Sequence, residues 1–163
     1  MSMKLDTVDV KILRVLQRDG RITNFRLAKK IGLTPMPTLA RVKKLERNGY
    51  IRRYVALVNQ ALLGMPVTAF VSVILESHKR KTSLDFVSAV MKLPEVLECH
   101  HIAGDEDFLL KVVAANPGDY EKFVLEKLTK IEGIEKVKTT FVLSSAKLET
   151  AVPLEARPPK KST

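Results

Sequence analysis

The sequence predicts an α+β chain in which a winged helix-turn-helix precedes a ferredoxin-like βαββαβ sandwich. The N-terminal third contains three short amphipathic helices and then a β-rich run, whereas the remainder follows the order β-α-β-β-α-β. We expect the first domain over residues 1–58, a linker over 59–65 and the second domain over 66–150. The proline-rich residues 151–163 lack core side chains and predict a disordered tail.

Cap residues and glycines mark the ends of the three helices in the first domain. Ser, Thr, Asp and Asn side chains cap helix N-termini, and Gly commonly follows a C-terminal end. Pro35 and Pro37 lie in the first turn of the third helix, where backbone N–H groups have no intrahelical partner, so they are tolerated. The expected boundaries are Asp6 and Gly20, Thr23 and Gly32, and Thr34 and Asn48.

The formal net charge of +10 belongs to the N-terminal part of the chain. Residues 1–60 contain fourteen lysines and arginines against four acidic residues, and residues 61–163 contain fourteen of each. Clustered positive charge of this kind indicates a polyanionic partner, because neutralised phosphates release condensed counterions. A merely soluble basic surface is the alternative.

The third expected helix is apolar on one side and basic on the other. Leu39, Val42 and Leu45 share the apolar side when residues are placed about 100° apart. The β-rich run over 50–58 is interpreted as the wing. This arrangement predicts a helix that enters the major groove of double-stranded DNA. We expect Met36, Thr38 and Arg41 near base edges, Lys44 and Arg47 nearer phosphates, Arg52 and Arg53 on the wing, and Arg21, Thr23 and Thr34 at phosphates beside helix starts.

An internal repeat indicates that the second domain is one pseudo-symmetric sandwich. Apolar residues over 87–96 recur with the same spacing 38 positions later, over 125–134. Two halves with one core spacing predict two similar helix-to-strand units. The expected strands lie at 67–76, 96–103, 108–114 and 136–143, and the expected helices at 83–93 and 117–131.

Several classes of site are excluded by the residue types present. The single cysteine, Cys99, excludes an intramolecular disulfide and a multi-cysteine zinc site. His100 and His101 are adjacent on an expected strand and point to opposite faces, so they cannot converge on one metal ion. We expect no metal, no cofactor and no catalytic residues. No stretch approaches the roughly 18 apolar residues of a membrane span, and we expect a cytoplasmic protein without a membrane partner.

Two segments resemble the Lrp/AsnC family of feast/famine transcription regulators. The first combines residues 20–24 (GRITN) with residues 31–51 (IGLTPMPTLARVKKLERNGYI), and the second is 98–111 (ECHHIAGDEDFLLK). The resemblance covers roughly Leu5 to Glu149. It implies a sequence-specific, nucleoid-associated DNA-binding regulator with a RAM-type second domain. It also implies homodimers formed through that domain, which assemble further into octamers.

The same resemblance implies an amino-acid effector site between subunits. A glycine lets backbone N–H groups approach a carboxylate, and an acidic side chain can receive an ammonium group. An ordinary acidic hairpin turn is the alternative. Because three acids within three positions repel one another, we expect Asp107 to serve the effector site and not the fold. The residues that the resemblance assigns to this site are Gly104, Asp105, Asp107, Thr139 and Thr140.

Two other functions stay open on the same two-domain layout. Sirohaem decarboxylases resemble it, and histidines would then be candidate catalytic groups. The basic side of the third helix argues against that enzyme. A chromosome-organising protein of low sequence specificity is the other alternative, and comparable affinity for random DNA would distinguish it.

Overall fold

The computed structural model describes residues 4–77 and 79–154 of the chain. The chain divides into two compact units. One holds the residues up to Leu57 together with the C-terminal segment from Lys147, and the other is Val58–Ala146.

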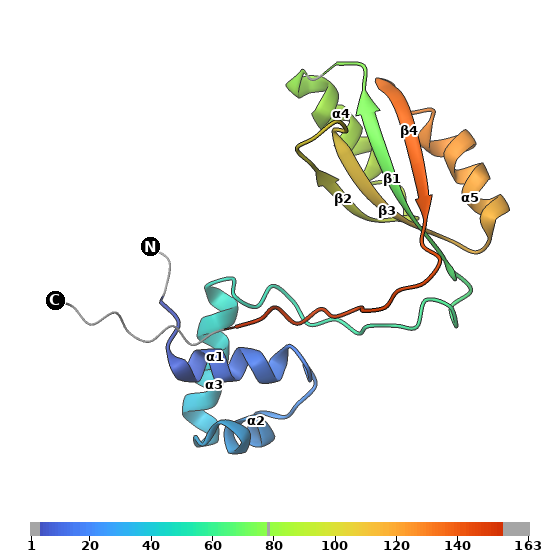
Figure 1. The fold of residues 1–163 in the computed structure, drawn as a ribbon. Coiled ribbons are helices and arrows are strands. Elements are labelled where there is room, and N and C mark those ends of the chain that lie inside the picture. Colours follow the sequence, from blue (N-terminus) through green and yellow to red (C-terminus); the bar gives the residue numbers. More distant parts are fainter. Residues whose placement is uncertain (1–3, 78, 155–163) are drawn as a thin grey trace. The chain divides into compact units, whose positions relative to one another are not determined.

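The first unit is a bundle of three helices, α1 (Thr7–Leu16), α2 (Asn24–Ile31) and α3 (Pro35–Arg47) (Figure 1). A capping box begins α1: the Asp6 side chain accepts from the Asp9 backbone N–H, and the Asp9 side chain accepts from that of Asp6. The helices enclose a small core made of Ile12, Leu13, Leu27, Ile31 and Leu45.

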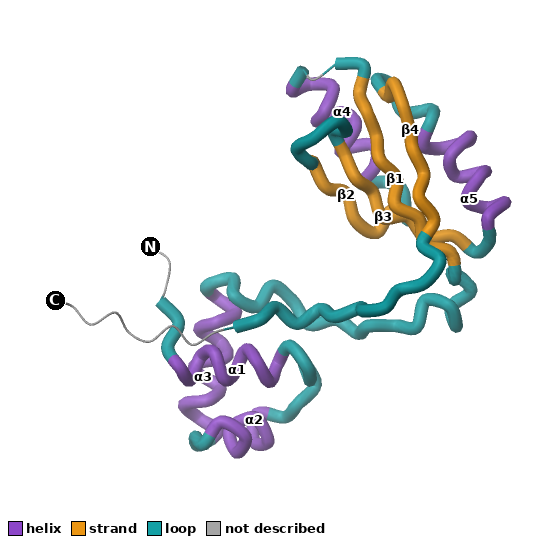
Figure 2. Tube along the Cα trace, in the orientation of Figure 1, coloured by secondary structure: helices purple, strands orange, loops and turns teal. Residues whose placement is uncertain are grey.

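The expected wing strand over 50–58 does not form in this single chain. Residues 52–59 are drawn as loop in Figure 2 and carry no strand pairing. Their β-prone side chains are largely exposed, and a strand forms only where another strand completes its hydrogen bonds. Tyr54 anchors the run to α3, because its hydroxyl donates to Glu46 Oε1 at 3.0 Å.

The expectation of a disordered tail over residues 151–163 does not hold for its first four residues. Residues 151–154 contact α1, whereas residues 155–163 lie outside the described part of the chain. The side chains of Arg14 and Gln17 bond to main-chain atoms of this segment. Because every residue has the same main-chain atoms, the composition of residues 151–154 does not indicate the contact.

The second unit has the ferredoxin-like topology that the sequence predicts. Its sheet has the order β2-β3-β1-β4, with every neighbouring pair antiparallel. Each crossover carries a helix, and the second helix continues from α5 into a π-helical turn, η1. The elements are β1 (Val67–Leu75), α4 (Arg80–Val90), β2 (Val96–His101), β3 (Phe108–Ala114), α5 (Pro117–Phe123), η1 (Val124–Leu128) and β4 (Ile134–Phe141).

Both helices cover the same face of the sheet (Figure 1). Along β1, buried Ala69, Val71 and Val73 alternate with partly exposed side chains, as expected for a strand with one covered face. These residues pack with Phe86 of α4 and Phe123 of α5. The opposite face of the sheet has no helix over it among the described residues.

The internal repeat is confirmed except at one position. Val90 and Leu128 are fully buried, and the other repeat positions pack around the same core, but Leu125 is 60% exposed. The π-helical turn explains the difference, since its wider repeat turns Val124 toward the core in place of Leu125.

Candidate nucleic-acid interface and ligand sites

The inward face of α3 differs from the expected one. Thr38, Arg41, Val42 and Leu45 are spaced i, i+3, i+4 and i+7 and face the first unit's core or α1. Thr38 is fully buried, and its Oγ1 donates to the carbonyl oxygen of Thr34 at 2.9 Å. The expected contact between Thr38 and a base edge is therefore wrong, because the side chain completes a bond inside the helix.

Arg41 joins α3 to α1. Its Nη1 lies 2.6 Å from Asp6 Oδ2 and 2.7 Å from Asp9 Oδ1. The Asp9 side chain is only 4% exposed, and that of Arg41 is 34% exposed. The expected role of Arg41 at a base edge is therefore not what the structure shows. The acidic capping box of α1 supplies two carboxylates that hold the guanidinium against the bundle.

This cluster also sets the protonation of Asp6. Burial acts to raise the pKa of the Asp6 carboxyl, but the hydrogen bonds from the Asp9 backbone and from Arg41 outweigh it and lower the pKa below the ordinary value. The Arg41 guanidinium is stabilised in return, since its bonds to Asp6 and Asp9 raise its pKa. Asp6 is therefore ionised at neutral pH and keeps its bond to Arg41.

The outward face of α3 consists of Met36, Ala40, Lys43 and Arg47, which are spaced i, i+4, i+7 and i+11. All four are exposed, and Met36 is 76% exposed. Leu39, expected on the apolar inward side, is 37% exposed and lies beside this face. Lys43 was missing from the expected contact set. The helical spacing identifies it once Thr38 and Arg41 are assigned to the inward side.

The remaining expected DNA contacts are exposed. The Thr23 hydroxyl caps α2 by accepting from the Arg26 backbone N–H at 3.3 Å, so its own proton stays available to a phosphate. Thr34 makes no side-chain cap bond to α3. Asn24 Nδ2 donates to the Pro35 carbonyl oxygen at 2.7 Å and joins α2 to the start of α3. The exposed residues from the expected set are Arg21, Thr23, Thr34, Lys44, Arg47, Arg52 and Arg53, and the exposed Arg26, Lys29 and Lys30 of α2 add to them.

Asp107 is part of the fold of the second unit. Its Oδ2 accepts from the backbone N–H of Leu75 at 2.8 Å, and its own N–H donates to Val73 at 3.0 Å. These bonds tie the loop between β2 and β3 to the end of β1. The expectation that Asp107 serves the effector site and not the fold is therefore wrong. The acids of this loop do not simply repel one another, because one of them turns inward onto a strand end.

The other expected effector residues do not converge within one chain. Gly104 and Asp105 are exposed at the tip of the loop, and Gly104 has a φ of +152°, which favours glycine. Thr139 and Thr140 lie on β4, level with Val71 and Phe70 of β1. Their side chains point to opposite faces of the sheet, and Thr139 Oγ1 lies 2.5 Å from the Tyr120 hydroxyl on the helix side.

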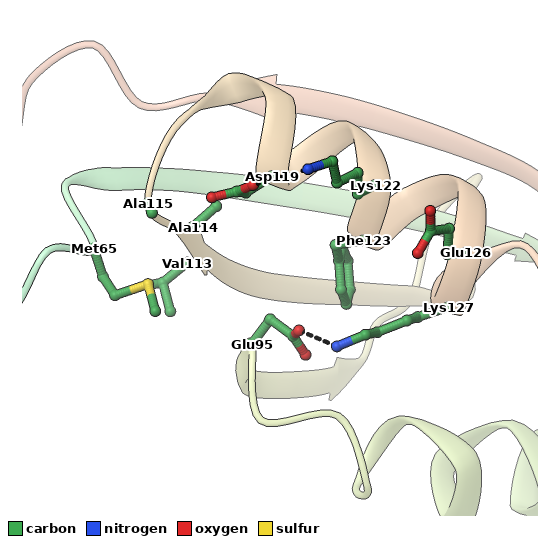
Figure 3. Close-up of a pocket in the computed structure, with 10 residues that line it drawn as sticks. All are labelled: Met65, Glu95, Val113, Ala114, Ala115, Asp119, Lys122, Phe123, Glu126 and Lys127. Atoms are coloured by element: carbon green, nitrogen blue, oxygen red, sulfur yellow. Dashed lines mark hydrogen bonds and ion pairs between the residues drawn. The ribbon is translucent and has the colours of Figure 1, made fainter.

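A cavity of about 340 Å³ opens at the end of the sheet opposite to that loop (Figure 3). Phe123 and Met65 line it with apolar surface, and an ion pair between Glu95 and Lys127 lies at its edge. Burial acts to raise the pKa of the Glu95 carboxyl, but the hydrogen bond and the charge of Lys127, together with a backbone hydrogen bond, outweigh it and lower the pKa. Asp119, Lys122 and Glu126 also line the cavity, so half of its lining residues are charged.

The histidines next to Cys99 have separate surroundings. His100 Nε2 lies 3.2 Å from Glu98 Oε2, and Glu98 Oε1 also accepts from Lys111 at 3.0 Å. The His101 ring packs against Phe108, with ring centroids 5.0 Å apart. Among the described residues, no three His, Cys, Asp or Glu side chains gather as a metal site would require.

Comparison with known proteins identifies the class of this chain. Residues 5–52 match the family model for a winged helix-turn-helix DNA-binding domain, and residues 68–152 match that for the Lrp/AsnC ligand binding domain. The chain therefore belongs to the Lrp/AsnC family and is a DNA-binding transcription regulator.

Two transcription regulators match this chain over most of their length. The leucine-responsive regulatory protein of Haemophilus influenzae is 41% identical over 88% of this chain and 86% of its own. The Bacillus subtilis transcriptional regulator AzlB is 37% identical over 95% of this chain and 99% of its own. These matches confirm the family that the sequence motifs indicate.

Solved structures confirm the fold. A Neisseria meningitidis transcriptional regulator in complex with L-Met superposes with a TM-score of 0.88 at 36% identity, covering 92% of this chain and 97% of the other. An AsnC family regulator from Agrobacterium tumefaciens gives 0.87 at 38% identity, covering 91% and 97%. In the described part of our chain, the helices are all too short or too polar to cross a lipid bilayer.

Proposed function

We propose that this regulator reads specific double-stranded DNA sites through the outward face of α3 and that an amino acid controls its binding. The observation that carries the first part is the exposure of Met36, Lys43 and Arg47 on one side of a helix fixed from behind by Arg41. In a helix-turn-helix, this side of the second helix faces base edges. Arg47, at the end of this face, contacts phosphates together with Arg21, Thr23, Thr34, Lys44, Arg52 and Arg53.

The ligand is proposed to be an amino acid because the Neisseria relative was solved with L-Met. We place it at the tip of the loop between β2 and β3, where Gly104 and Asp105 are exposed. Asp107 holds that loop on β1, and Thr139 and Thr140 complete the site from another subunit. Within one chain, the loop between β2 and β3 and the threonines of β4 lie on opposite sides of β1. This separation supports a site that two subunits share.

The proposed assembly is a homodimer formed through the second unit, and dimers associate further into octamers. The uncovered face of the sheet supports a dimer surface, because Phe70, Ile74 and Leu109 point to it from β1 and β3. Lys111 and Glu98 form an ion pair on the same face. A second sheet packed there would exclude water from these apolar side chains.

We infer that the protein acts in the cytoplasm on the nucleoid and has no catalytic role or cofactor. The named relatives are transcription regulators, which supports a regulator over a sirohaem-decarboxylase-like enzyme. Tight tetrapyrrole binding without any DNA binding would instead support the enzyme.

The effector proposal is tested by measuring DNA affinity during titration with each of the twenty amino acids. The probe is a DNA fragment enriched from random sequence, and sedimentation follows the assembly state in parallel. At least one amino acid is expected to change DNA affinity by about 5- to 150-fold, the usual range of coupling between two sites, together with assembly. If none changes either quantity, the effector proposal is wrong while DNA binding stands.

A further inference from the structure

Residues 151–154 pack beside α1 within the first unit, and neither DNA contact nor the proposed ligand site uses this contact (Figure 1). Gln17 follows the last residue of α1 and pairs with both main-chain groups of Val152. Its Nε2 donates to the Val152 carbonyl oxygen at 3.2 Å, and its Oε1 accepts from the Val152 N–H at 2.7 Å. The side-chain amide thus takes the place of a neighbouring β-strand.

Arg14 of α1 extends the contact by one turn. Arg14 Nε donates to the Leu154 carbonyl oxygen at 3.1 Å, and its Nη2 donates to the same oxygen. Arg14 and Gln17 are three residues apart and therefore lie on the same side of the helix. The Leu154 side chain packs against the apolar core of the first unit. The contact therefore combines hydrogen bonds to main chain with one apolar anchor.

We propose that residues 151–154, which we name the C-terminal clamp, dock on α1 and connect β4 to the DNA-binding helices. Residues 142–150 lead from the end of β4 to the clamp, so the clamp is a second connection between the units besides residues 58–66. On α1, Asp6 and Asp9 hold Arg41 of α3. On this proposal, a displacement of β4 acts on α1 through residues 142–154 and reaches α3 through Arg41.

Hydrogen–deuterium exchange of the full-length protein tests whether the clamp is docked in solution. Gln17→Ala removes both bonds to Val152, and a stop after Ala146 removes the clamp itself. A stop after Leu154 is the matched control, because it shortens the chain but keeps the clamp. We expect the last turn of α1 to exchange about tenfold faster in the first two variants and at the wild-type rate in the control. Wild-type exchange in both clamp variants would overturn the proposal.

The coupling role rests on the proposed function, and it is tested with an amino acid that changes wild-type DNA affinity. In Gln17→Ala, calorimetry should show wild-type amino-acid binding, whereas the change in DNA affinity should be reduced several-fold. An undiminished change would show that the clamp does not transmit the signal. If no amino acid binds even the wild type, the effector proposal fails, and the exchange experiment still decides whether the clamp exists.

Discussion

Arg41→Ala is expected to destabilise the DNA-binding unit by about 2–3 kcal/mol. The substitution removes the guanidinium that holds Asp6 and Asp9, and it leaves the Asp9 carboxylate almost fully buried without it. Removing one partner of a buried ion pair costs more than the pair itself contributes, since the other charge stays desolvated. Urea denaturation followed by circular dichroism measures this loss in the full-length protein.

Arg47→Ala on the same helix is the matched control for this prediction. Arg47 is exposed on the outward face, so its loss should weaken DNA binding while leaving the free energy of unfolding within about 0.5 kcal/mol of wild type. If Arg41→Ala instead unfolds like wild type and loses only operator binding, Arg41 contacts bases and the assignment of the inward face is wrong.

Asp107→Ala is expected to destabilise the second unit by about 1–3 kcal/mol. Its Oδ2 is the acceptor for the backbone N–H of Leu75, a residue that is only 2% exposed, and the substitution leaves that donor unsatisfied. Thermal unfolding with and without amino acids measures the loss, which should already be present in the ligand-free protein.

Two variants separate this structural role from ligand binding. Asp107→Asn keeps an oxygen acceptor and should recover most of the stability, whereas Asp105→Ala, at the exposed tip, should unfold like wild type. If Asp107→Ala is as stable as the wild type, Asp107 serves the ligand site and has no structural role.

The periodicity of apolar residues predicted most of the fold, because each helix or strand buries side chains at a regular spacing. The topology of the second unit followed from alternating and helical patterns. The C-terminal clamp was missed for a different reason. It is held through main-chain atoms of Val152 and Leu154, and a sequence pattern does not show where main chain will bind.

The candidate site was predictable as a region but not residue by residue. Basic charge located the DNA-binding helix, yet charge alone does not distinguish an arginine that faces DNA from one that faces a carboxylate on another helix. Arg41 is the second kind, because the capping box of α1 lies behind it. Asp107 shows the same limit, since its partner is a backbone N–H of a distant strand.

Selection of bound sites from random double-stranded DNA tests most directly the claim that the outward face of α3 reads sequence. The wild type is expected to enrich one motif, and Met36→Ala or Lys43→Ala should alter the preferred bases within it, with each lost contact costing about 1–3 kcal/mol at its position. Enrichment of no motif, with equal affinity for all DNA, would contradict the account and indicate a chromosome-organising protein of low specificity.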